Sequence, residues 1–207
     1  MEIKVIAVGM LQANCCLIID ESTKICAVVD PGANAEKIMD VVNKNGLKVE
    51  SILLTHGHFD HVMAAPELQS QTGAKLYIHK ADAPMLDGAG AGHGGYIKGE
   101  YHTPRIDGYL EDGMTLPVGS LTCTVLNTPG HTPGSCVILC GDAMLAGDTL
   151  FLESCGRVDF EGGSAQDMRA SLTRLRDLPG DYTVYPGHAD ITTLSHERAH
   201  NPYMPKR

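Results

Sequence analysis

The stretch Thr55-His56-Gly57-His58-Phe59-Asp60-His61 decides the fold of this 207-residue chain. The apolar run 52–54 comes directly before it. A short apolar run that ends in imidazoles and carboxylates predicts a buried strand with metal ligands in the loop at its end. His56 and His58 are two residues apart, so both can point the same way from a strand end. Asp60 and His61 follow after a turn and can face a second point nearby.

Three more candidate ligands lie downstream in similar settings. His131, Asp148 and His188 each follow a short apolar run, and each has glycine or proline beside it to turn the chain. Taken alone, each pattern is more typical of an ordinary turn. Together, the strand ends favour a site assembled from loops at one edge of a rigid sheet, rather than a polar loop whose histidines are merely solvated.

The order His-x-His-x-Asp-His, then His, then Asp, then His resembles the metallo-β-lactamase superfamily over nearly the whole chain. Within that superfamily, the segments 151–160 and 185–188 are similar to the glyoxalase II-like hydrolases, the relatives of hydroxyacylglutathione hydrolase. The resemblance implies an α/β fold, the four-layer αβ/βα metallo-β-lactamase sandwich, formed by residues 1–207 as a single domain. Two strand-rich halves, each with helices, agree with such a sandwich.

The resemblance also implies a role for each candidate ligand. One metal would be held by His56, His58 and His131, a second by Asp60, His61 and His188, and Asp148 would bridge both. Neutral imidazoles and carboxylates suit two zinc ions, with iron or manganese as alternatives. The centre would provide a metal-bound hydroxide near neutral pH and would stabilise the oxyanion formed at an attacked carbonyl. Asp60 and Asp148 are therefore the catalytic candidates.

The implied activity is metal-dependent hydrolysis of a thioester or small ester, with S-lactoylglutathione as the model substrate. A thiolate leaves with little protonation, so no dedicated general acid is required. The full-length glyoxalase II pattern adds a C-terminal helical region that binds glutathione, whereas this chain ends about twenty residues after His188. Arg157 falls near a basic position that contacts glutathione in that family, and it is the substrate-binding candidate. The alternative is an ion pair with Asp159 that braces the metal loop.

Three other interpretations stay open. A persulfide dioxygenase-like oxidoreductase would share the fold and a similar His-x-His-x-Asp-His motif but would use a single iron. A true β-lactamase agrees less well with a carboxylate bridge at Asp148 and with a chain that starts without an export signal. A non-catalytic, zinc-stabilised binding protein agrees less well with a ligand set in which no position is substituted.

Composition and charge narrow the class of protein. There are 16 Lys and Arg against 25 Asp and Glu, a formal net charge of −9, which argues against a nucleic-acid surface. Apolar residues make up 43% of the chain, yet no run approaches the roughly 18 apolar residues of a membrane span. Residues 1–5 have a strand pattern in place of a secretory signal, so we expect a cytoplasmic enzyme with a small-molecule substrate and reduced cysteines. Nothing in the pattern indicates an oligomeric state.

The periodicity of apolar residues outlines the elements. We expect strands at 3–8, 15–19, 25–29, 52–55, 73–79, 121–127, 135–140, 143–147 and 182–185, and helices at 35–44, 63–72, 164–177 and 194–200. Ser164 lies three residues before Asp167, which is typical of a helix start. The segment 82–107 is rich in glycine, and a lid over the metal site competes with a surface excursion as its interpretation. His93 and His102 are not needed as ligands, because the set is already complete.

Overall fold

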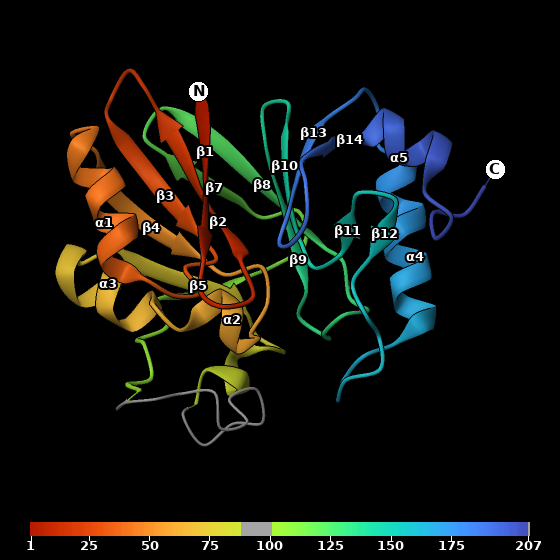
Figure 1. The fold of residues 1–207 in the computed structure, drawn as a ribbon, viewed down its shortest axis with the longest axis horizontal. Coiled ribbons are helices and arrows are strands. Elements are labelled where there is room, and N and C mark those ends of the chain that lie inside the picture. Colours follow the sequence, from red (N-terminus) through yellow and green to blue (C-terminus); the bar gives the residue numbers. More distant parts are fainter. Residues whose placement is uncertain (88–100, 207) are drawn as a thin grey trace.

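The computed structural model describes residues 1–87 and 101–206, in which the strands form two six-stranded sheets and a small two-stranded one (Figure 1). The first sheet has the order β1 (Glu2–Val8), β2 (Ala13–Asp20), β3 (Ile25–Val29), β4 (Lys48–Leu53), β5 (Lys75–His79) and β6 (Gly108–Leu110). The second has the order β14 (Thr192–Thr193), β13 (Thr183–Pro186), β10 (Ala143–Gly147), β9 (Cys136–Cys140), β8 (Leu121–Asn127) and β7 (Thr115–Val118). The small sheet pairs β11 (Leu150–Phe151) with β12 (Ser154–Cys155).

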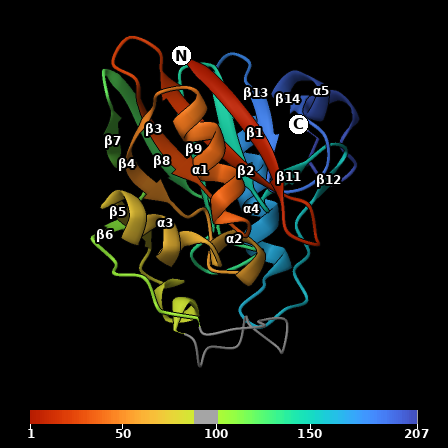
Figure 2. The same cartoon turned by 60° about the vertical axis from the view of Figure 1, so that its left-hand side comes forward.

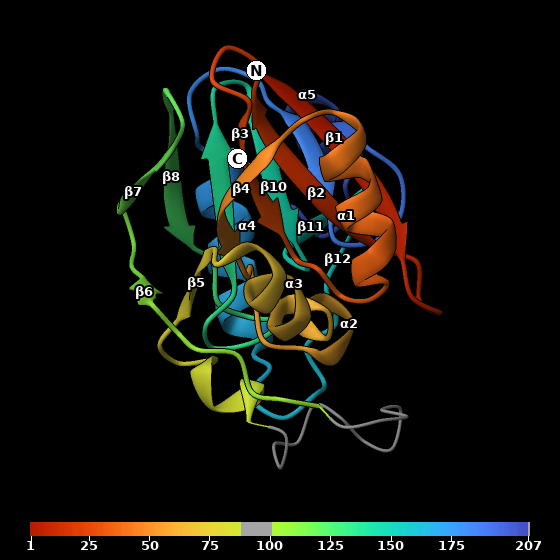
Figure 3. The same ribbon diagram turned by 90° about the vertical axis from the view of Figure 1, so that its left-hand side faces the viewer.

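Helices cover the outer face of each large sheet. The first sheet carries α1 (Ala35–Lys44) and α3 (Ala65–Thr72), and the second carries α4 (Ala165–Arg176) and α5 (Leu194–His200). Figure 1 shows these two helix layers on opposite sides of the molecule, and Figure 2 brings α1 and α3 in front of the first sheet. In Figure 3 the helices α1 and α3 face the viewer while α4 lies behind the strands. The arrangement is the expected αβ/βα sandwich.

Three apolar clusters separate the four layers. The first lies between α1, α3 and the first sheet, the second between the two sheets, and the third between the second sheet and α4 and α5. Strand β2 contributes side chains to two of these clusters. Its side chains alternate, so Leu17 and Ile19 enter the first cluster while Cys16 and Ile18 enter the second. A strand buried on both faces is accordingly apolar at nearly every position.

The candidate ligands lie at one edge of the paired sheets. Strands β4, β8, β10 and β13 all end there, each shortly before one or more candidate ligands. Backbone hydrogen bonds join the two sheets at this edge, from Cys136 N to the Thr55 carbonyl oxygen at 2.8 Å and from Asn14 N to the Gly187 carbonyl oxygen at 2.7 Å. The loops that follow the strands are therefore brought together by the main chain itself.

Most of the expected elements are confirmed, and the differences cluster near the site. The helices at 35–44 and 194–200 have the expected bounds, and α4 begins directly after Ser164, whose Oγ accepts a hydrogen bond from Asp167 N at 3.2 Å. The helix expected at 63–72 is confirmed as α3, which begins two residues later than expected, with Pro66 in its first turn. The short helix before it, α2 (Phe59–Val62), was not expected. The short strands β6, β7, β11, β12 and β14 were not expected.

The possible lid at 82–107 is only partly described. Residues 88–100, including His93, lie outside the described residues, so the lid stays a prediction. The start of the segment is well packed: Asp82 is fully buried and precedes a 3-10 helix, η1 (Ala83–Leu86). His102 is exposed. All seven cysteines are free, and no helix within the described residues has the length and apolar character to cross a membrane.

Candidate metal centre

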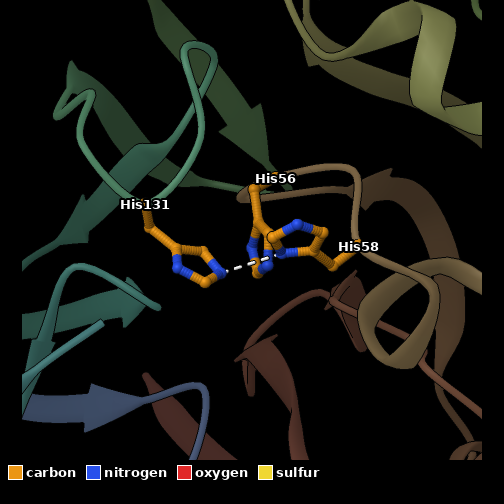
Figure 4. A group of neighbouring side chains, drawn as sticks. All are labelled: His56, His58 and His131. Carbon is orange, nitrogen blue, oxygen red and sulfur yellow. Dashed lines mark hydrogen bonds between the residues drawn. The ribbon is translucent and has the colours of Figure 1, made fainter. Parts of the chain in front are cut away.

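The first cluster brings together three imidazoles from two loops. His56 and His58 come from the loop after β4, and His131 comes from the loop after β8. One ring nitrogen from each lies within 4.8 Å of the others (Figure 4). The dashed line in Figure 4 joins His58 Nδ1 to His131 Nε2 at 2.8 Å. These three histidines can hold one metal ion.

The second cluster contains a carboxylate and two imidazoles. Asp60 and His61 lie on α2, and His188 follows β13. His188 Nε2 lies 3.1 Å from Asp60 Oδ2 and 3.3 Å from His61 Nε2. In place of the expected turn, the chain forms the short helix α2, and the side chains of Asp60 and His61 on it both face the site.

Asp148 lies between the two clusters. Its Oδ1 is 3.4 Å from His61 Nε2, and its Oδ2 is 3.4 Å from His131 Nε2. The residue follows β10 and is nearly buried, and Oδ1 makes no hydrogen bond. All seven residues that the sequence singled out as ligands therefore converge on one location.

The sequence analysis missed Asp30, which supports the ligands from behind. Asp30 is buried at the end of β3, with a left-handed φ of 52°. Its Oδ1 accepts a hydrogen bond from Thr55 N at 2.7 Å, and its Oδ2 accepts from Thr55 Oγ1 at 2.6 Å and from His61 Nδ1 at 3.0 Å. The segment Asp30-Pro31-Gly32 is typical of a turn, so the sequence alone does not indicate this role.

Hydrogen bonds on the far side of the imidazoles determine which ring nitrogens carry protons. His131 Nδ1 lies 2.7 Å from the carbonyl oxygen of Arg157, which can only accept, so His131 presents a bare Nε2 to the site. His61 Nδ1 donates to Asp30 in the same way. Thr55 Oγ1 donates to Asp30 and is therefore free to accept from His56 Nδ1 at 3.1 Å. These hydrogen bonds leave Nε2 of each of the three rings as the atom that can bind a cation, although at His61 the cation must first displace a proton.

Burial keeps two histidines of the first cluster, His56 and His58, neutral. Burial, followed by the neighbouring imidazoles, lowers the pKa of His56 far below its ordinary value. The same causes lower the pKa of His58 to about 4. A neutral imidazole is the form that binds a metal, so His56 and His58 need no deprotonation at neutral pH.

Carboxylates dominate the second cluster. Burial lowers the pKa of His61, but Asp148, Asp30 and Asp60 outweigh burial and raise it to about 9. The hydrogen bond to Asp60 raises the pKa of His188. Burial raises the pKa of Asp60, yet the hydrogen bond from His188 and the nearby imidazoles lower it to about 2. In the absence of a metal, this cluster binds protons at the positions where a cation would lie.

The residues present fit a metal centre. His56 Nε2 and Asp148 Oδ1 are buried and form no hydrogen bond, which is costly for polar atoms unless a cation completes them. Glycine is required around them, because a β-carbon at Gly187 would collide with Asp148 Oδ1 and one at Gly156 would collide with the Asp148 carbonyl oxygen. Imidazole nitrogens and carboxylate oxygens are ligands for zinc and iron.

Arg157 lies at the rim and is already paired. Its Nε and Nη2 donate to Asp159 at 2.7 Å and 2.6 Å, and its guanidinium lies 3.9 Å from the centre of the Phe160 ring. The Phe160 ring in turn lies 5.6 Å from the His58 ring and is 46% exposed. The ion pair that the sequence analysis gave as an alternative is present, and a contact with substrate stays a prediction.

The chain belongs to the metallo-beta-lactamase superfamily, because the model of that family matches residues 8–188. Among its relatives, hydroxyacylglutathione hydrolase GloC of Haemophilus influenzae is 32% identical, with 99% of this chain and 98% of the relative covered.

Two solved structures are similar over nearly their whole length. A B3 metallo-beta-lactamase, BLEG-1, has a TM-score of 0.90 and 30% identity, covering 98% of this chain and 99% of its own. TTHA1623, solved in a di-iron-bound form, has a TM-score of 0.85 and 34% identity, covering 97% of this chain and 99% of its own. The family and the His and Asp clusters together support a metallo-hydrolase.

Proposed function

We propose that this protein is a dinuclear metal-dependent hydrolase that cleaves thioesters of the S-lactoylglutathione type. The observation that carries the proposal is the position of Asp148. Its two oxygens lie 3.4 Å from His61 Nε2 and 3.4 Å from His131 Nε2, one candidate ligand in each cluster. A carboxylate in that position suits two cations held side by side.

The two clusters divide the ligands as the family resemblance implies. His56, His58 and His131 would hold one metal, Asp60, His61 and His188 the other, and Asp148 would contact both. The metals, when bound, would lower the pKa of a water and polarise the carbonyl under attack. Zinc is the first candidate, and iron is the second because a relative of known structure holds two irons.

The protein's own contribution is to keep the ligands oriented. Asp30 holds the proton of His61 on Nδ1, and the Arg157 carbonyl oxygen holds that of His131 on Nδ1. The two rings therefore present their Nε2 atoms before any metal or substrate arrives. Such prior orientation avoids reorganisation during the reaction.

The rim favours a substrate with an acyl group and a negative charge. Phe160 offers a half-exposed aromatic face beside His58, where a small acyl group could pack. The Arg157 guanidinium lies over the same ring and is exposed enough to meet a carboxylate. The name of the Haemophilus influenzae relative supports glutathione thioesters, since that relative is matched over 98% of its length.

Hydrolysis of β-lactams is a second candidate, favoured by the likeness to the BLEG-1 structure. The test is one substrate panel with zinc-loaded and iron-loaded protein: S-lactoylglutathione, a simple acyl thioester, a chromogenic cephalosporin, and glutathione persulfide with an oxygen electrode. We expect about two metals per chain and turnover of the thioesters. Metal content that stays below one after reconstitution would refute the dinuclear centre. Oxygen uptake without thioester cleavage would favour the dioxygenase, and a metal-loaded protein without any turnover would favour the binding protein.

A further inference from the structure

A buried carboxylate outside both clusters connects the two loops of the first one. Asp82 follows β5, at the start of η1, and its side chain has no solvent exposure. Its Oδ2 accepts hydrogen bonds from Gly57 N at 3.0 Å and from Thr132 Oγ1 at 2.6 Å. Its Oδ1 accepts from Gly134 N at 2.7 Å. One carboxylate is therefore shared between loops that are more than seventy residues apart in sequence.

Each donor to Asp82 is close in sequence to a candidate ligand. Gly57 lies between His56 and His58, and Thr132 directly follows His131. Because a peptide group moves with its neighbours, the position of Gly57 N restricts both flanking imidazoles, and Thr132 restricts His131. The nitrogens of these imidazoles lie within 4.8 Å of one another, close enough to share a cation.

The fit around Asp82 leaves no space for larger residues. A β-carbon at Gly134 would lie 2.5 Å from Asp82 Oδ1, and a β-carbon at Gly57 would lie 2.7 Å from the Met85 side chain. Burial raises the pKa of Asp82, although its hydrogen bonds partly oppose that effect. Within residues 1–87 and 101–206, no lysine or arginine forms an ion pair with it. An unpaired buried carboxylate is costly, so its retention calls for a role.

We propose that Asp82 is a positioning residue for the first metal: its carboxylate holds the Gly57 loop and the Thr132–Gly134 loop at the separation that His56, His58 and His131 need to share one ion. The proposal rests on the dinuclear site put forward above. Loss of a buried partner behind a metal ligand typically weakens metal binding about 10- to 100-fold. We expect an effect of that size on one of the two metals.

The test variant is Asp82→Asn, which preserves the shape of the side chain. An amide has one accepting oxygen, and its NH2 group cannot accept from a backbone N–H. If that oxygen faces Gly134 N, Gly57 N loses its acceptor, and if the amide is flipped, Gly134 N loses its acceptor instead. Either orientation releases one of the two loops while keeping the core packed.

Asp20→Asn is a matched control. Asp20 is also buried, and its carboxylate also ties two loops, because it accepts from Ser22 and Thr23 on one side and from Ser120 N at 2.7 Å on the other. It lies at the far end of β2, roughly 20 Å from the metal edge at about 3.3 Å per residue. A merely structural carboxylate should therefore affect melting in both variants and metal retention in neither.

The measurement is metal retained per chain by zinc-loaded protein against rising chelator concentration, with thermal melts alongside. We expect Asp82→Asn to lose one metal at a chelator concentration at least tenfold lower than the wild type, and Asp20→Asn to retain both. Equal retention in the two variants, with two metals in the wild type, would overturn the positioning role alone. A wild type that retains no metal would instead refute the dinuclear site.

Thr132→Val provides a second test of the proposal if Asp82→Asn does not fold. This substitution removes one hydrogen bond to Asp82 and preserves the shape and burial of the side chain. We expect a severalfold lower chelator midpoint for one metal. A chelator midpoint equal to that of the wild type would contradict the proposal.

Discussion

Replacing Asp30 by asparagine should weaken metal binding without touching a ligand. In the wild type, Asp30 Oδ2 accepts from both Thr55 Oγ1 and His61 Nδ1. The asparagine oxygen can stay opposite Thr55 N, but the NH2 group then faces His61 Nδ1, and two donors oppose each other. The ring can relieve this conflict by moving its proton to Nε2, the nitrogen that would bind the second metal.

The expected magnitude follows from the contacts that change. One ligand presented in the wrong tautomer, or without its supporting hydrogen bond, should cost about 10- to 100-fold in affinity for the second metal, or roughly 1.4–2.8 kcal/mol. Stability should fall as well, because the hydrogen bonds from Thr55 Oγ1 and His61 Nδ1 lose their charged acceptor. At about 1 kcal/mol for each of two such bonds, we expect a loss of roughly 2 kcal/mol.

The assay is chelator competition on zinc-loaded protein, with urea unfolding of the same samples. Asp20→Asn again serves as the control, since it removes a buried carboxylate of similar connectivity far from the metals. If Asp30→Asn retained both metals as tightly as the wild type while losing the expected stability, the reasoning on the His61 tautomer would be refuted.

Three further predictions concern the same centre. Asp148→Ala should lose activity and at least one metal, whereas Asp142→Ala, at the exposed turn between β9 and β10, should retain both; similar behaviour of the two variants would contradict the ligand assignment. Arg157→Ala should raise KM for S-lactoylglutathione severalfold while melting changes little, since its ion pair is exposed and contributes little to stability; kinetics and melts together check this. Carboxylates outweigh burial and raise the pKa of metal-free His61 to about 9, so a metal must displace a proton there. Affinity for the second metal should therefore fall about tenfold per pH unit as the pH drops below 9. Metal retention measured across pH checks this, and a flat profile would contradict it.

Elements away from the site could be predicted from local pattern alone. Helix α1 has the expected bounds because its buried residues repeat with helical spacing, and because Gly46 follows with a left-handed φ of 62°. The stretch that became α2 gave no such signal, since its four residues include Asp60 and His61, which face the site instead of a core. Pro66 could have marked the start of a new helix, because proline is favoured in a first turn.

The ligands were predictable because each follows a strand, but their supports were not. Asp30 and Asp82 are each followed by residues typical of a turn or loop, and their roles depend on partners 25 to 52 residues away. One clue was available for Asp30. It follows β3, which is parallel to β4, and the carboxyl ends of neighbouring parallel strands meet at one edge of a sheet. A similar clue existed for Asp82, which lies three residues past the end of β5, a strand that is also parallel to β4.

For recognition of glutathione, the expectation from the sequence and the comparison with relatives differ. If the loops around the metal centre hold the tripeptide only weakly, the loss of uniform binding appears as a high KM more than as a low kcat. Yet the GloC relative carries the name hydroxyacylglutathione hydrolase and is covered over 98% of its length by this chain. If this chain binds glutathione tightly, we expect groups at the rim of the metal centre to contribute contacts. Arg157 and Phe160 at the rim are then the first residues to test, because they combine an exposed cation with an exposed aromatic face next to His58. A micromolar KM that depends on both would place the glutathione site there.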